Sequence, residues 1–435
     1  MKENILYNHS FAIQTPLPSK IFLYAFLIFN FLPSLYLFVT NYYEGLYGAS
    51  DTKDYYNALY LNFIIIIIFG MLYLIFLLIF KLFLKVKSNY SVVLIGNTKK
   101  IFNENILIKT STQSYFVSKQ MYNFVLRFGA FGSILVWIYF FSGGYEKLLL
   151  LGADVDQWEF RIISYDDRSR FLIAFLEVAR RFILPFTCVY LLVFKSMKIN
   201  YTKKRVIYFY LFSLLLSGIM TLDRGPILLF FVMFIFVKIN FKISKFQYFF
   251  GSIISLLGII FLASVLTYLQ YNILDFSFSQ VFESALNFLW HRTILVPSIA
   301  SIELSYYNFP LGSDKLYLSF SRLGAIFGKD YIAIGDANSL YVTPVGFIAD
   351  IWRNVGLAGI VVFSIFFAFL FSKLDSIQSK LSPIMRIPFS FTTLSFCFFL
   401  IFGVFFSQGI FVHIIMMFIV GSALKNENIR HSYDA

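Results

Sequence analysis

Long apolar segments with almost no charged residue recur along the chain, separated by shorter polar stretches. Residues 21–40 and 59–80 are two examples. Each has about the 20 apolar residues that a helix needs to cross the hydrocarbon core of a bilayer. A water-soluble domain does not need many such segments, so the pattern predicts an all-α polytopic membrane protein. Ten spans fit best: 21–40, 59–84, 121–141, 171–194, 206–222, 226–241, 248–268, 355–372, 388–406 and 410–424.

The polar stretches between these spans alternate in charge. Segment 85–120 carries six lysines against one glutamate, and segment 195–205 carries five basic residues and no acid. Segment 142–170 lies on the other side and has six acids against four bases. Positive charge marks the cytoplasmic side of a membrane protein. Both termini are therefore expected in the cytoplasm, and the loops 142–170 and 269–354 on the outer face.

Composition agrees with this interpretation and excludes several other classes. Only 14% of the residues are charged, against roughly 25% in a soluble domain. The net charge of +13 follows from the basic inner loops, so we expect no nucleic-acid partner. Cys188 and Cys397 fall inside predicted spans and are expected to be packing residues. The four histidines form no metal-ligand spacing, and we expect neither a metal nor a cofactor.

The whole chain, 1–435, is predicted to be one integral membrane domain with a large outer loop at 269–354. Loops longer than about 15 residues without regular structure tend to be functional or disordered. This loop is rich in aromatic and aliphatic residues, such as Phe288 and Trp290, and is not disordered by composition. Part of 279–307 is therefore expected to be helical and packed against the outer ends of the spans.

Three charged residues fall within the fourth predicted span: Glu177, Arg180 and Arg181. Charges there cost several kcal/mol unless they are paired or face a wet cavity. Glu177 and Arg181 are four residues apart and can form an internal ion pair of purely structural meaning. The segment nevertheless carries two arginines for one glutamate, which favours an anion-binding role. Pro185 is expected to bend the helix one turn further on.

Two further arginines stand in positions suited to phosphate. Arg224 belongs to the sequence Asp-Arg-Gly-Pro, in which Pro226 favours the start of a helix with free N–H groups. The alternative is an Asp223 cap beside a solvated arginine. Arg292 follows His291 in the large loop, where the histidine is a candidate base near neutral pH. The alternative for this second pair is an ordinary polar surface.

Small polar residues precede the eighth predicted span. Asp336 and Asn338 lie in the sequence Gly-Asp-Ala-Asn-Ser, and Asp350 and Arg353 follow closely. Groups of this kind are suited to binding sugar hydroxyls. The alternative is turn chemistry, for which Asp, Asn, Gly and Ser are common, with Asp350 and Arg353 simply pairing three residues apart.

These features together resemble the family of O-antigen polymerases (Wzy-type), which is related to the O-antigen ligases. The Asp-Arg-Gly turn at 223–225 resembles a turn common in that family, and the large late loop contains Arg292 and Pro297. The third feature is the segment 338–359, in which small polar residues and an aspartate lead to Asn-Val-Gly-Leu-Ala-Gly at the start of a span. The similarity covers roughly 170–375 in pattern and the whole chain in topology.

The resemblance implies a GT-C-like membrane glycosyltransferase with a large periplasmic loop, in the bacterial inner membrane. Its donor and acceptor would be oligosaccharides on undecaprenyl pyrophosphate, and a chain-length regulator protein would be an expected partner. In the implied reaction, arginines would bind the pyrophosphate, and a base would lie near the acceptor hydroxyl. The assigned residues are His291, Asp336 and Arg292 for catalysis, and Arg180, Arg181, Arg224, Asn338, Asp350 and Arg353 for substrate binding.

Other functions remain open at this point. An O-antigen ligase shares the architecture and differs in its acceptor. A flippase for lipid-linked oligosaccharides is the alternative from another class, although transporters often show two similar halves and no internal repeat is visible here. A purely structural scaffold does not need several arginines close to the bilayer.

Overall fold

The computed structural model describes most of the expected spans and little of the loops. It covers residues 15–40, 52–99, 119–146, 170–196, 204–221, 224–240, 347–381, 383–402 and 413–422, with Glu283, Ser298 and Ile302. Every regular element in these residues is helical. The elements are α1 (Pro18–Phe26), η1 (Leu27–Phe31), α2 (Leu32–Thr40), α3 (Thr52–Lys99), α4 (Lys119–Tyr139), η2 (Phe140–Gly144), α7 (Arg170–Val178), η3 (Ala179–Ile183), α8 (Leu184–Ser196), α9 (Lys204–Thr221), α10 (Arg224–Asn240), α16 (Phe347–Ser379) and α17 (Pro383–Phe402). A helix His413–Ser422 follows α17.

Helices suited to a membrane are present, as the sequence predicts. Among the described residues, four helices are long and apolar enough to cross a bilayer: Pro18–Thr40, Tyr56–Phe83, Met121–Gly144 and Val355–Ser379. Met385–Ile401 and His413–Ser422 are shorter apolar helices. The described residues are therefore compatible with the predicted all-α membrane protein, whereas the number of ten spans stays a prediction. Helices α7 to α10 coincide with the fourth to sixth predicted spans, whereas the seventh predicted span, 248–268, lies outside the described residues.

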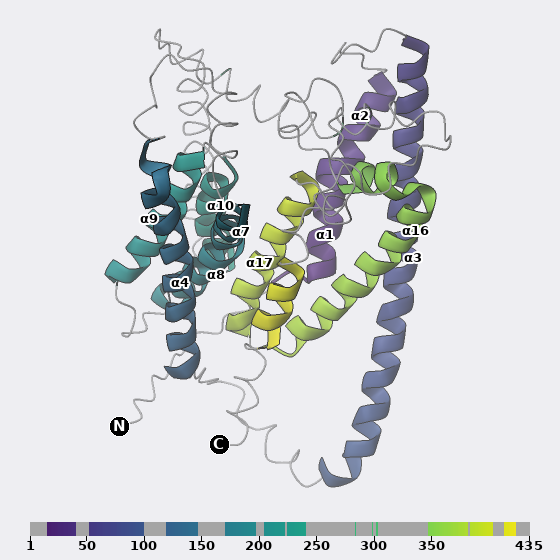
Figure 1. Cartoon of the computed structure of the whole chain (residues 1–435). Coiled ribbons are helices and arrows are strands. Elements are labelled where there is room, and N and C mark those ends of the chain that lie inside the picture. The colour runs from purple at the N-terminus through teal and green to yellow at the C-terminus, as the bar shows by residue number, and fades with distance from the viewer. Residues whose placement is uncertain are drawn as a thin grey trace.

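The helices form two groups, and α17 joins them (Figure 1). One group contains α1, α2, α3 and α16, and the other contains α4 and α7 to α10. Helix α17 packs against α1 and α16 in the first group and against α8, α10 and η3 in the second. Segments from both ends of the sequence thus meet along one central helix.

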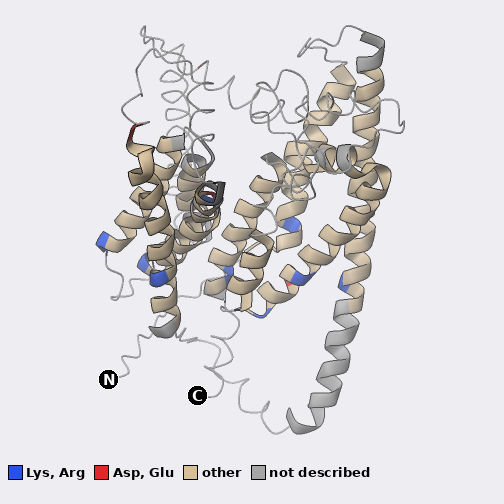
Figure 2. Ribbon diagram, in the orientation of Figure 1, with Lys and Arg blue, Asp and Glu red and all other residues tan. Residues whose placement is uncertain are grey.

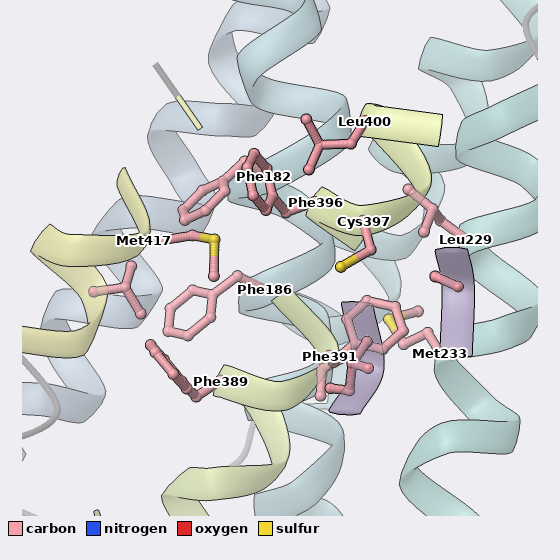
Figure 3. Packing of buried hydrophobic residues seen from close by; sticks show 14 of the residues in the cluster. Phe182, Phe186, Leu229, Met233, Phe389, Phe391, Phe396, Cys397, Leu400 and Met417 are labelled. Carbon is pink, nitrogen blue, oxygen red and sulfur yellow. The ribbon is translucent and has the colours of Figure 1, made fainter. Parts of the chain in front are cut away.

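The contact between the groups is an apolar core. Figure 3 shows side chains of η3, α8 and α10 facing those of α17 and the last helix; the labelled residues are Phe182, Phe186, Leu229, Met233, Phe389, Phe391, Phe396, Cys397, Leu400 and Met417. Cys188 and Cys397 are both free and buried, which confirms their prediction as packing residues. In a bilayer the lipid tails are as apolar as these side chains, so close van der Waals contact rather than burial holds the helices together.

Glycines of α4 make one such contact very close. A Cβ atom at Gly132 would lie 2.7 Å from the Cγ2 atom of Ile183 in η3, and one at Gly129 would lie 2.5 Å from that of Thr187 in α8. Any side chain at either position would push α4 away. The small residues therefore set the distance between α4 and the helix that carries the charged site.

Two of the described π-helical turns end two residues before a proline. Turn η1 precedes Pro33, and η3 precedes Pro185. A proline inside a helix has no N–H to donate, and its ring crowds the carbonyl four residues earlier. In η3 the N–H of Leu184 donates to the carbonyl of Ala179, five residues earlier. The distortion expected near Pro185 therefore lies in the preceding turn, which contains both arginines of the fourth span.

Gly356 divides α16 into two parts. Its φ of 70° and ψ of −155° belong to a region that essentially only glycine adopts. Residues 347–355 form a separate helix that lies across the bundle before the span begins (Figure 1). Residues up to 354 are predicted to belong to the large loop, whereas the structure shows that 347–354 are helical and that Phe347 and Ile351 are buried.

Residues of the large loop also reach the core. Ser298 and Ile302 are helical and buried. The hydroxyl of Ser34 in α2 donates to the Oγ atom of Ser298 at 3.5 Å. These positions confirm part of the expectation that 279–307 contains packed helix.

Basic residues of the described helices gather toward one end of the bundle (Figure 2). We call it the lower end and define it as the end where α1 begins and α16 finishes. There the carboxylate of Asp375 contacts Ser19 and Lys81, at 2.6–2.9 Å. The amide of Gln378 also donates to Ser390 of α17 at 2.9 Å. Polar contacts thus join the helix ends at this level.

Candidate functional site

The described site consists of three charged side chains at the junction of α7 and η3. One carboxylate oxygen of Glu177 accepts a hydrogen bond from Arg180, and the other lies 2.5 Å from Nε of Arg181. The side chain of Arg180 is only 1% exposed, while Glu177 and Arg181 keep 22% and 28%. The predicted pairing of Glu177 with Arg181 is confirmed, and Arg180 shares the same carboxylate.

These charges are far from either end of their helical segment, which runs from Arg170 to Ser196. A single charge at the centre of a membrane helix costs about 3 kcal/mol on insertion scales. The spacing of three and four residues places both guanidinium groups within reach of Glu177. Pairing reduces the cost of the buried charges and also fixes the positions of two cations.

The backbone of the site is attached to α17. Pro185 has no N–H, so it cannot bond to the carbonyl of Arg181 four residues earlier, as an α-helix would require. The hydroxyl of Ser395 donates to that carbonyl instead, at 2.8 Å. A contact across the junction of the two helix groups thus replaces a helical hydrogen bond.

An aromatic ring of α17 supports the second arginine. The guanidinium carbon of Arg181 lies 4.6 Å from the ring centre of Phe399, within the range of cation–π attraction. His413, which is buried, stacks on the same ring at 4.7 Å and contacts Phe182 edge to face at 5.8 Å. The site therefore combines residues of η3, α17 and the last helix.

Sequence reasoning found the charged residues and missed the aromatic support. His413 lies within the tenth predicted span, 410–424, and neither it nor Phe399 or Ser395 is among the predicted site residues. The only signal for His413 is a lone histidine in an apolar helix, which is most often a packing residue. No sequence pattern relates Arg181 to residues more than 200 positions away.

The structure describes three other predicted site residues only by their place in a helix. Arg224 begins α10, and Pro226 stands in its first turn, where a proline costs no helical hydrogen bond. The expected helix start at this motif is confirmed. Asp350 and Arg353 lie on the helix 347–355 that crosses the bundle. The phosphate and sugar roles of these residues stay predictions.

The remaining predicted site residues, His291, Arg292, Asp336 and Asn338, lie outside the described residues. Within the residues that are described, no three His, Cys, Asp or Glu side chains are grouped so as to hold a metal ion. No protein-family model, curated protein or solved structure matches the chain.

Proposed function

We propose that the chain is a membrane glycosyltransferase of the O-antigen polymerase type. It would transfer a growing glycan from undecaprenyl pyrophosphate to a new lipid-linked repeat unit, on the periplasmic face of the bacterial inner membrane. The proposal includes ten spans and cytoplasmic termini. A polymerase must bind a lipid diphosphate at the membrane, so its site needs cations close to apolar helices.

The observation that carries the proposal is the arginine pair on η3. Two guanidinium groups share Glu177 in the interior of an apolar helix, and Arg181 keeps accessible surface. Guanidinium groups present paired donors that fit phosphate oxygens. Because Phe399 and Ser395 hold this turn against α17, the donors need little reorganisation when a diphosphate binds.

The proposed chemistry follows from these groups. The acceptor hydroxyl oxygen forms a bond to the anomeric carbon of the donor, and the bond from that carbon to the phosphate oxygen breaks. The electron pair remains on the pyrophosphate, whose growing negative charge the arginines stabilise. The hydroxyl proton moves to a base, for which His291 is the first candidate and Asp336 the second.

The distribution of charge supports the proposed orientation. Lys and Arg residues of the described helices gather toward the lower end (Figure 2), as expected of a cytoplasmic side. Arg181 lies 15 residues before the end of α8 at Ser196, which corresponds to roughly 22 Å of α-helix. The site would therefore lie in the outer half of the bilayer, where lipid-linked substrates are expected after flipping.

A deletion strain distinguishes the proposed function from its alternatives. Lipopolysaccharide from cells without a polymerase should run on a gel as core plus one repeat unit. Loss of a ligase or of a flippase should leave bare core, and flippase loss should also trap lipid-linked units on the inner side. Complementation with Arg181→Ala should not restore long chains, whereas Lys204→Ala, at an exposed position, should do so. Bare core in the deletion strain, or long chains with Arg181→Ala, would contradict the proposal.

A further inference from the structure

The two arginines of the site are held in different ways. Arg180 is buried, and its terminal nitrogen donates to Glu177. Arg181 keeps 28% of its side-chain surface exposed, and its guanidinium lies over the ring of Phe399. The first arginine has the environment of a structural partner, and the second has that of a group which can also meet a ligand.

The two oxygens of Glu177 show the same difference. Oε1 accepts the hydrogen bond from Arg180. Oε2 is buried and 2.5 Å from Nε of Arg181, yet it accepts no hydrogen bond. Charge attraction is therefore present on this side without the aligned N–H that makes a charge-assisted bond strong. The contact between Glu177 and Arg181 is the weaker half of the cluster.

We propose that Glu177 is a displaceable internal counter-ion, which occupies the position on Arg181 that a diphosphate oxygen of the substrate takes. This inference rests on the proposed function, because it assumes a lipid diphosphate at the same arginines. On binding, the phosphate oxygen replaces Oε2 at Arg181, while Oε1 stays on Arg180. When the product lipid diphosphate leaves, the carboxylate returns and neutralises the cation.

This arrangement has a kinetic consequence. A carboxylate that competes with the ligand weakens binding of substrate and product alike, and it promotes release of the product. Its removal would tighten both complexes. A variant without the competing charge is therefore expected to have a lower KM and a lower kcat, because release of the lipid diphosphate becomes slow.

The test uses purified full-length protein in nanodiscs, with undecaprenyl pyrophosphate and undecaprenyl phosphate as probes. Glu177→Gln keeps an acceptor for Arg180 and removes the charge, and it should bind the diphosphate about tenfold more tightly than the wild type. The monophosphate should gain less. Arg181→Ala should lose most binding of the diphosphate. Asp375→Asn removes the carboxylate that pairs with Lys81, far from the arginines in the sequence, and should leave both affinities unchanged.

The outcomes separate the inference from the proposed function. Unchanged or weaker binding by Glu177→Gln, with binding lost in Arg181→Ala, would overturn the displacement and leave the diphosphate site standing. Normal binding by Arg181→Ala would remove the diphosphate site itself. If Glu177→Gln does not fold, Glu177→Met takes its place, because it removes the charge, keeps an unbranched side chain of similar length and leaves both arginines in place. That variant should also bind more tightly, and wild-type affinity in it would overturn the inference.

Discussion

The carboxylate of Asp375 caps the first turn of α1 through Ser19, a residue 356 positions earlier in the chain. Its Oδ1 accepts the backbone N–H of Ser19 at 2.9 Å, and its Oδ2 accepts the hydroxyl at 2.6 Å. Lys81 of α3 contacts Oδ2 at 2.9 Å and donates to the Ser19 hydroxyl at 2.8 Å. Three helices therefore share one capping carboxylate at the lower end.

Loss of this carboxylate should destabilise the helix group that contains α1, α3 and α16. Asp375→Ala leaves a helix N-terminus and a lysine without their acceptor, which costs about 1–3 kcal/mol. We expect a lower melting temperature in detergent, measured by intrinsic fluorescence. Ser379→Ala, at an exposed position near the end of the same helix, is the control. An unchanged melting temperature in Asp375→Ala would show that water replaces the carboxylate at no cost.

Two glycines should respond to substitution for different reasons. Gly132→Val forces α4 away from Ile183 in η3, so it should lower both stability and chain extension by displacing the arginine site. Gly356→Ala meets no neighbouring atom within 4 Å, and its effect comes from the positive φ alone, about 1–3 kcal/mol. Thermal melting and a polymerisation assay on both variants test this difference. Equal activity of Gly132→Val and wild type would contradict the close approach.

The arginine of the large loop should separate chemistry from folding. If Arg292 binds phosphate, Arg292→Ala should abolish chain extension at normal membrane levels, and Arg292→Lys should restore only part of it, since a point charge lacks the paired donors. His291→Ala and Asp336→Asn, assayed separately, identify the base, because the variant that loses the base should be inactive. Chain growth is measured with purified enzyme and lipid-linked repeat units. Normal turnover in Arg292→Ala would show that Arg292 does not bind phosphate and is an ordinary surface residue.

A buried amide in α3 provides a test in the opposite direction. The side chain of Asn62 is buried, and its Nδ2 has no hydrogen-bond partner within the described chain. Leucine has the same branched arrangement of heavy atoms as asparagine, and Asn62→Leu should raise stability by about 1 kcal/mol. Gln378→Leu is the contrast, because its amide donates to Pro16 and Ser390, and it should lower stability. If Asn62→Leu abolishes activity in a well-folded protein, the amide binds a ligand.

Topology can be tested by thiol labelling in a background without Cys188 and Cys397. Single cysteines at positions 100 and 200 should resist a membrane-impermeant reagent in intact cells, because they belong to the basic loops. A cysteine at 156, in the acidic loop, should react. Labelling at 100 or 200 from outside would reverse the proposed orientation.

The sequence predicts features that depend on local spacing and composition. The apolar segments locate the helices, and the four-residue spacing of Glu177 and Arg181 predicts their contact. The sequence does not predict contacts between distant segments. Examples are the cation–π contact of Arg181 with Phe399 and the hydrogen bond from Ser19 to Asp375. These long-range contacts depend on how the helices pack against one another. Small residues and the shapes of aromatic rings determine that packing, and the periodicity of the sequence does not encode it.

Backbone irregularities were also only partly predictable. Pro185 indicates a distortion, but the residue alone does not say that the preceding turn widens rather than bends. Gly356 looks like any glycine at the start of a span, and only its positive φ reveals the boundary between a crossing helix and a span. The site therefore lies at a position where the proline indicates an irregular helix, although the sequence does not specify which kind of irregularity forms.

The π-turn at η3 has a consequence for the evolution of this site. A π-turn contains one residue more than the α-helical turn that it replaces, so deletion of any one residue from 179–183 could restore a regular helix. This deletion would leave α7 and α8 on nearly the same faces, because the wider turn takes up its extra residue without rotating the helix on either side. Glu177 would keep its face, whereas Arg180 and Arg181 lie inside the turn and would change their positions relative to α17. In an alignment of relatives, a one-residue gap at this turn should therefore accompany a change in the arginine pair, even where the neighbouring apolar sequence is well preserved.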